Sequence, residues 1–200
     1  MTMKSTLLAA GAVLAMAFPA AAEKLPLSAI SSYLNSLTTA QAGFTQLNED
    51  GTRSAGQLYI KRPGKMRFEY DPPNEGLVMA GSGAVAIFDG RSNQPPETYP
   101  LKRTPLSIIL APNVNLGRER MVIGHTEDGI ATVVTAQDPD NPDYGTIKLY
   151  FTANPVTLRQ WVINNGDGGT VTVRLGELKT GISLSNDLFN IRKQEGRPER

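Results

Sequence analysis

The sequence predicts a mainly β, α+β domain in which about ten or eleven antiparallel strands form one sheet that closes, or nearly closes, on itself. Three observations predict it. Apolar and polar residues alternate with period two along most of the chain. Turn residues separate the alternating segments. Only two segments have helical spacing, too few to cover a sheet on both faces, so the sheet must surround its own inward side chains.

The first 22 residues have the pattern of a cleaved secretory signal peptide. Lys4 precedes the apolar run 7–18, and Pro19 and Ala20-Ala21-Ala22 form a cleavage site of small residues. A transmembrane anchor is the alternative, but so short a run cannot cross a hydrocarbon core about 30 Å thick. We therefore expect secretion into the periplasm, a single domain over 23–200, and a flexible tail over about 191–200.

The two segments with helical spacing differ in length. The first follows Pro26 and repeats apolar residues every three or four positions, at Leu27, Ile30, Leu34 and Leu37. The second has Thr104 as its cap and Pro105 at the first helical position. Its apolar residues are Leu106, Ile109 and Leu110, and Pro112 ends it.

The clearest hairpin surrounds the turn Arg62-Pro63-Gly64. On both sides of the turn the even-numbered residues are apolar: Leu58, Ile60, Met66, Phe68 and Tyr70. The odd-numbered residues Lys65, Arg67 and Glu69 point to the opposite face. Further strands are predicted at 77–79, 85–88, 121–125, 130–135, 146–151, 158–164, 170–175 and 181–185. The sequences 81–83, 127–129 and 165–169 are hairpin turns by composition.

Composition favours binding over catalysis. The formal net charge of +1 provides no field to hold nucleic acid. There is no cysteine, and a single histidine, His125, excludes a zinc site built on a histidine pair. The acidic loop 138–143 has Asp143 where a calcium loop needs Gly, which favours a polar hairpin loop. No nucleotide-binding or nucleophile-elbow motif occurs. We expect no enzyme activity, no metal and no cofactor.

One stretch is more specific than these patterns. Residues 57–73, which contain Lys61-Arg62-Pro63, follow Gly43-Phe44-Thr45-Gln46 and precede Gly90 and Thr104-Pro105-Leu106. These motifs in this order resemble the family of periplasmic outer-membrane lipoprotein carriers, the LolA-type chaperones. The resemblance implies an incomplete, strongly curved antiparallel β-barrel, with short helices forming a lid over a hydrophobic cavity for acyl chains.

The resemblance also implies site residues. The lid-holding arginine of the family falls on Arg62, and its cavity positions fall on Met66 and Phe68. Leu58, Ile60 and Tyr70 share the even-numbered face of these strands, so we add them to the predicted cavity face. The resemblance further implies that Leu106, Ile109 and Leu110, in the second helix, are lid residues. From the residues alone, Arg62 reads instead as part of an exposed basic hairpin with Lys61 and Lys65. The charged C-terminal tail is shorter than the extension of some family members, and Phe68 stands near where some carry tryptophan.

The function that the resemblance implies is transport of lipoproteins across the periplasm by a monomer. Its partners would be acylated lipoproteins, an inner-membrane lipoprotein-releasing ABC transporter and, where present, an outer-membrane lipoprotein acceptor. A same-fold lipid carrier or lipoprotein sensor is the alternative, and a carboxylate-dependent hydrolase is a remote one. The absence of a cysteine to lipidate argues against the membrane-anchored acceptor of the same fold.

Overall fold

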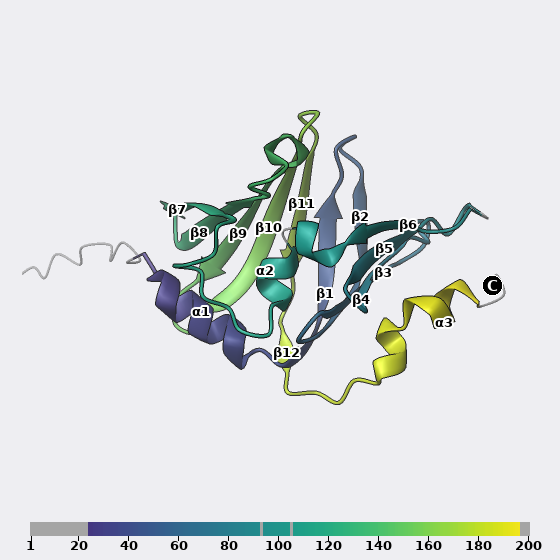
Figure 1. The fold of residues 1–200 in the computed structure, drawn as a ribbon, viewed down its shortest axis with the longest axis horizontal. Coiled ribbons are helices and arrows are strands. Elements are labelled where there is room, and N and C mark those ends of the chain that lie inside the picture. The colour runs from purple at the N-terminus through teal and green to yellow at the C-terminus, as the bar shows by residue number, and fades with distance from the viewer. Residues whose placement is uncertain (1–23, 93, 105, 197–200) are drawn as a thin grey trace, which may run out of the picture.

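The computed structural model of the protein describes residues 24–92, 94–104 and 106–196. The predicted signal peptide and Pro105 lie outside the described residues. Twelve strands form one open antiparallel sheet, with β6 and β7 as its two edges. The strong curvature of this sheet, visible in Figure 1, makes it the incomplete barrel that the sequence predicts. No helix in the described part of the chain is long and apolar enough to cross a membrane.

The first half of the sheet, which we call the N-terminal wing, contains six strands. They are β1 (Thr39–Leu47), β2 (Arg53–Lys61), β3 (Lys65–Tyr70), β4 (Leu77–Gly81), β5 (Ala84–Phe88) and β6 (Glu97–Pro100). Each pairs with the next along the chain. Gly64, with φ of +72°, supplies the left-handed residue of the tight turn between β2 and β3.

The other half, the C-terminal wing, contains five strands that return toward the first. They are β7 (Val122–Asp128), β8 (Ala131–Gln137), β9 (Gly145–Thr152), β10 (Thr157–Asn165) and β11 (Thr170–Leu175). Strand β11 pairs with β1 and so joins the two wings. The two-residue β12 (Lys179–Thr180) pairs with the beginning of β1.

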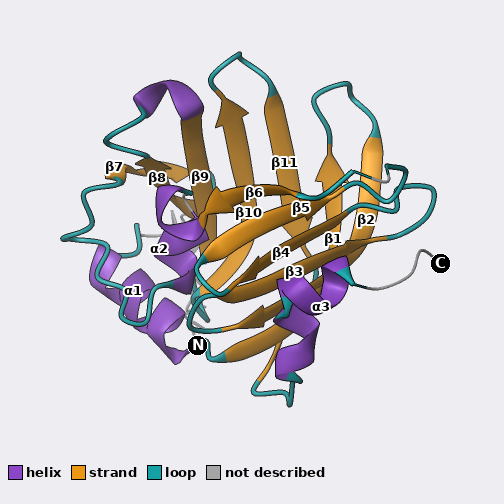
Figure 2. Ribbon diagram, turned by 45° about the vertical axis from the view of Figure 1, so that its right-hand side comes forward, coloured by secondary structure: helices purple, strands orange, loops and turns teal. Residues whose placement is uncertain are grey.

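Three α-helices are described. They are α1 (Leu27–Ser36), α2 (Leu106–Leu110) and α3 (Ile191–Glu195), with 3₁₀ turns at Leu101–Arg103, Pro142–Tyr144 and Asn186–Phe189. Figure 2 shows α1 and α2 on the concave side of the sheet, and α3 against the opposite side of β3 and β4. Pro26 is the N-cap of α1, where its missing N–H costs no hydrogen bond.

The inward faces of both wings form one apolar core. Strand pairing sets Leu58 opposite Phe68 and Ile60 opposite Met66, so the predicted parity holds across the β2–β3 turn. The side chains of Ile30 and Leu34 in α1 are fully buried against this core. Burial of this kind contributes about 25 cal/mol per Å² of apolar surface, which makes the core the main stabilising element.

Two parts of the C-terminal region differ from the sequence interpretation. The strand predicted at 181–185 is wrong, because the chain turns at Gly181, with φ of +70°, and leaves the sheet. Residues 182–185 then run outside the N-terminal wing. Where a flexible tail was expected, residues 191–195 form α3.

Candidate lid and apolar interior

The β2–β3 turn places the guanidinium of Arg62 against the carboxyl ends of two helices. Arg62 Nη1 donates to the carbonyl oxygen of Leu34 and, at 3.5 Å, to that of Leu37; Nη2 donates to the carbonyl oxygen of Ala111. The backbone N–H of Gly64 donates to Leu110 O at 2.9 Å. Carbonyl oxygens at helix ends lack partners within their helix and carry partial negative charge, so a cation is favoured there.

Among the described residues, Arg62 is held by carbonyl oxygens and forms no ion pair with a carboxylate. Its Nε is buried and has no hydrogen-bond partner among the described residues. Burial lowers the pKa of the Arg62 guanidinium from its usual value, although an arginine this basic stays protonated. The hydrogen-bonding capacity of this side chain is therefore not fully used among the described residues.

Helix α1 is also bound to the segment that follows α2. Asn35 of α1 donates to Val114 O at 2.9 Å and accepts from Val114 N at 2.8 Å, so one amide makes two bonds to the segment after α2. Ser31 Oγ accepts from the N–H of Leu116 at 3.1 Å. Helix α1, helix α2 and residues 111–116 therefore form one unit, which we call the lid.

The lid meets the C-terminal wing at two further points. The hydroxyl of Tyr33 accepts from Leu158 N at 3.2 Å, and its ring packs edge-on against Phe151. Just before α1, Leu25 donates its N–H to Thr132 Oγ1, and its carbonyl lies 2.8 Å from a ring nitrogen of His125. The only histidine thus contacts backbone, and no group of metal-ligating side chains occurs among the described residues.

The apolar residues predicted for the cavity face and for the lid lie in one buried cluster. Leu58, Ile60, Met66, Ile109 and Leu110 are at most 1% exposed, and Phe68 is 6% exposed. Phe68 packs edge-on against Phe44 and Trp161, with ring centroids 5.3 and 5.7 Å apart.

Tyr70 and Leu106 are the two predicted residues at the margin of this interior. Both are half-buried and pack against the core, and Tyr70 donates its hydroxyl proton to Gln46 Oε1 at 2.8 Å. Two hollows in the described part of the chain lie away from these residues. One of about 890 Å³ lies near the β1–β2 turn, and one of about 660 Å³ lies beside α3. The predicted cavity residues belong to one packed apolar cluster.

The sequence model of one protein family matches most of this chain. The model, described as outer membrane lipoprotein carrier protein LolA, matches residues 35–192. The chain belongs to this family.

Individual members of the LolA family are distant in sequence. The chain is 26% identical over 196 residues to an outer-membrane lipoprotein carrier protein of Methylococcus capsulatus, which covers 92% of this chain and 91% of the relative. It is 28% identical over 191 residues to one of Pseudomonas aeruginosa strain UCBPP-PA14, with 91% and 88% covered. A LolA superfamily protein from Nitrosomonas europaea superposes with a TM-score of 0.43 at 9% identity, over 83% of this chain and 98% of that structure.

Several polar side chains that connect α1 to the rest of the molecule were not predicted from the sequence. Asn35, Ser31 and Tyr33 all lie on α1 and contact segments that are distant along the chain. A polar residue on an amphipathic helix normally faces solvent, so spacing alone does not single these residues out. Only the fold brings their partners within reach.

Proposed function

We propose that this protein is a periplasmic carrier that binds the acyl chains of lipoproteins released from the inner membrane and delivers them to the outer membrane, without catalysing a reaction. Its membership of the LolA family supports this function. The observation that carries the proposal is the contact of Arg62 with the carbonyl oxygens of Leu34, Leu37 and Ala111, at the ends of two helices that pack on a buried apolar cluster.

The chemistry of the cargo requires such a carrier. Burying one methylene group is worth about 0.8 kcal/mol, so an acyl chain of about sixteen carbons costs on the order of 12 kcal/mol to hold in water. A lipoprotein with several chains therefore does not cross an aqueous compartment unaided. The interior beneath the lid is lined by Leu58, Ile60, Met66 and Phe68, which suit such chains.

Release of the cargo is the harder requirement, and the lid addresses it. Because the interior is packed when the lid is closed, an acyl chain must displace the lid to enter. Entry then breaks the bonds from Arg62 to Leu34, Leu37 and Ala111. The free energy recovered on closing the lid offsets part of the binding energy, which lets the carrier surrender its cargo.

The proposed partners follow from this cycle. An inner-membrane ABC transporter that releases lipoproteins supplies the cargo, and an outer-membrane acceptor, where present, receives it. A monomer suffices because one chain contains the whole lid and interior. The predicted signal peptide delivers the chain to the periplasm.

Replacing Arg62 by Leu tests the proposal. The variant folds, because the lost bonds are few and partly offset by the desolvation of the guanidinium. Each lost charge-assisted bond is worth about 1.5 to 3 kcal/mol, so the lid shifts toward open by about tenfold or more. We expect acyl chains to load at least as well as in the wild type and transfer to acceptor membranes to slow. Arg62→Lys restores transfer poorly, because an ammonium lacks the planar fork of donors.

The measurement is transfer of a triacylated lipoprotein from loaded carrier to acceptor membranes. Arg53→Leu is the matched control, since Arg53 is an exposed arginine at the start of the same strand, β2. Its transfer rate should equal that of the wild type. A wild-type rate from folded Arg62→Leu would contradict the proposed lid and return Arg62 to an ordinary turn cation.

A further inference from the structure

We propose that the C-terminal segment, residues 182–195, is part of the device that closes the lid, and that Lys61 and Lys65 are the positioning residues that connect it to Arg62. The inference rests on the proposed function, since it concerns the same lid. It assigns a role to a segment that lies on the outer face of the sheet, away from the apolar interior.

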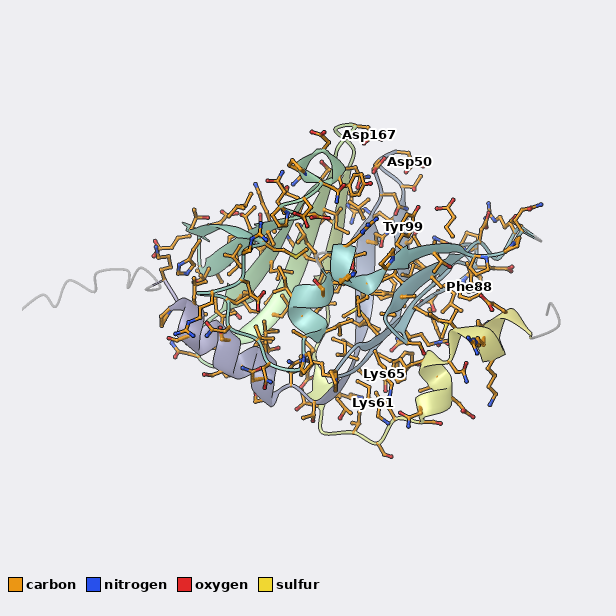
Figure 3. The ribbon with its side chains drawn as sticks, viewed as in Figure 1. Asp50, Lys61, Lys65, Phe88, Tyr99 and Asp167 are labelled. Atoms are coloured by element: carbon orange, nitrogen blue, oxygen red, sulfur yellow. The ribbon has the colours of Figure 1, made fainter. Side chains whose placement is uncertain are left out.

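The β2–β3 turn is held from both of its sides. On the inner side, Arg62 and Gly64 bind the ends of the lid helices. On the outer side, Lys61 Nζ donates to Leu184 O at 2.6 Å, and Lys65 Nζ donates to Asn186 Oδ1 at 3.0 Å. Figure 3 shows both lysines at the end of this hairpin, next to the C-terminal segment. The two cations flank Arg62 in sequence and pair opposite each other in the strand register.

The C-terminal segment can restrain the β2–β3 turn because its far end is anchored to β3 and β4. Arg67 is 6% exposed and donates to Leu188 O at 3.1 Å. Phe189 is 3% exposed, and its carbonyl lies so close to Gly81 that a Cβ there would sit 2.4 Å from the oxygen. Met79 and Ala86, on the same outer face as Arg67, have no exposed surface. An outer face of this kind is normally solvated, so the segment covers it as a packed layer.

The near end of the segment is fixed to the chain that leaves α1. The N–H of Gly181 donates to Thr39 O at 3.0 Å, and the N–H of Arg62 donates to Thr38 O at 2.7 Å. Strand β12 continues this contact by pairing with Ala40 and Gln41. The segment therefore passes around the end of the hairpin, with both of its ends attached to the N-terminal wing.

This arrangement fixes the position from which Arg62 reaches the lid. Hydrogen bonds from a planar guanidinium depend on distance and direction, so a shift of about 1 Å in the turn weakens several of them at once. Lys61 and Lys65 restrain the turn against such a shift by connecting it to the anchored segment. Without them the lid opens more often, although Arg62 itself is unchanged.

The single tryptophan provides a direct measure of lid opening. Trp161 is 2% exposed and packs against Phe68 in the interior. Quenching of its fluorescence by acrylamide in the ligand-free protein therefore reports access to the interior without any lipid. We compare wild type, Arg62→Leu, the double methionine variant (Lys61→Met with Lys65→Met) and the double arginine variant (Lys61→Arg with Lys65→Arg). Lys148→Met, an exposed lysine on β9, is the matched control.

We expect the double methionine variant to raise the quenching constant about three- to tenfold, with a melting temperature close to that of the wild type. The double arginine variant, which keeps two cationic donors, should stay near the wild type, and so should Lys148→Met. Arg62→Leu should exceed them all.

The failures of the two proposals are distinguishable. If Arg62→Leu raises quenching but the double methionine variant does not, the lid stands and the role of the C-terminal segment is overturned. The role of the segment is also overturned if Lys148→Met or the double arginine variant raises the quenching constant as much as the double methionine variant does. The effect would then not depend on the cationic contacts. If Arg62→Leu leaves Trp161 as protected as in the wild type, the proposed lid and the inference built on it both fail.

Discussion

Arg62 and Arg67 stand on the same β-hairpin and hold opposite faces of it. Each donates to backbone carbonyl oxygens of a segment that is remote in sequence, Arg62 to the lid and Arg67 to the C-terminal segment. Arg67 also forms an ion pair with Glu69, with Nε and Oε1 2.7 Å apart, and contacts Gln194 and the sulfur of Met79. Arg62 has neither an ion pair nor a partner for its Nε among the described residues.

This difference allows one hairpin to support a fixed contact on one face and a reversible contact on the other. A buried guanidinium with a carboxylate partner and several acceptors is costly to expose, because every partner loses its bond. A guanidinium with an unsatisfied Nε and only carbonyl partners recovers hydration when it is released. We therefore expect Arg67 to act as a permanent anchor and Arg62 as a releasable one.

The largest effect on stability is expected from a charge on the inner face of this hairpin. Phe68→Glu loses two edge-to-face ring contacts and buries a carboxylate, so the free energy of unfolding falls by about 4 kcal/mol and binding of a fluorescent hydrophobe is abolished. Thr45→Glu, on an exposed outer position of β1, should change neither quantity. Phe68→Leu, which keeps an apolar side chain, should fold and bind. A folded Phe68→Glu protein with unaltered binding would place this face outside the binding site.

The next largest effect is expected from the permanent anchor. Arg67→Met removes the ion pair of Glu69 and leaves the acceptors at Leu188 and Gln194 without this donor, so the free energy of unfolding falls by about 2 to 3 kcal/mol. Limited proteolysis should then cut within residues 182–195 first. Arg159→Met, at an exposed position on β10, is the control and should stay within about 0.5 kcal/mol of the wild type. Unchanged proteolysis in Arg67→Met would show that the arginine does not anchor the segment.

A smaller effect is expected from the bond that unites the lid. Asn35→Ala removes two bonds to Val114 at an exposed position of α1, so the free energy of unfolding falls by about 1 kcal/mol. Hydrogen exchange at the N–H of Val114 and at that of Leu116 should become faster, while exchange in α1 stays slow. The neighbouring Ser36→Ala serves as the control. Equal exchange in Asn35→Ala and wild type would mean that α1 and the segment after α2 do not depend on this amide.

The residues on the inner face of the hairpin could be predicted from the sequence because the pattern that identifies them lies within the hairpin itself. Alternation from Leu58 to Tyr70 fixes which residues share a face, and the turn at Pro63 and Gly64 preserves the strand phase. The two helices on the concave side were predicted from spacing after Pro26 and Thr104. The position of Arg62 on this face follows from the same parity, but its carbonyl partners depend on helix ends that lie 25 or more residues away.

The burial of the outer face could not be predicted because the segment that covers it is distant along the chain. Parity places Arg67 outward, where an arginine is normally solvated, and only the C-terminal segment, more than 100 residues away, buries it. That segment has alternating apolar residues at Ile182 and Leu184, which favoured a strand. The backbone at Gly181 instead directs it out of the sheet. Edge strand β6 was also missed, because all four of its residues are exposed and give no alternation.

Hydrogen exchange on the wild-type protein, with and without a bound triacylated lipopeptide, tests the contrast between the two anchors most directly. The N–H of Gly64 donates to the lid at Leu110 O, and the N–H of Gln194 donates to Asn190 O within the C-terminal segment. We predict that loading accelerates exchange at Gly64 by tenfold or more, on the order of the population shift set by losing the Arg62 bonds, and leaves exchange at Gln194 unchanged. Unchanged exchange at Gly64 in the loaded protein would contradict a lid that separates from Arg62 on loading.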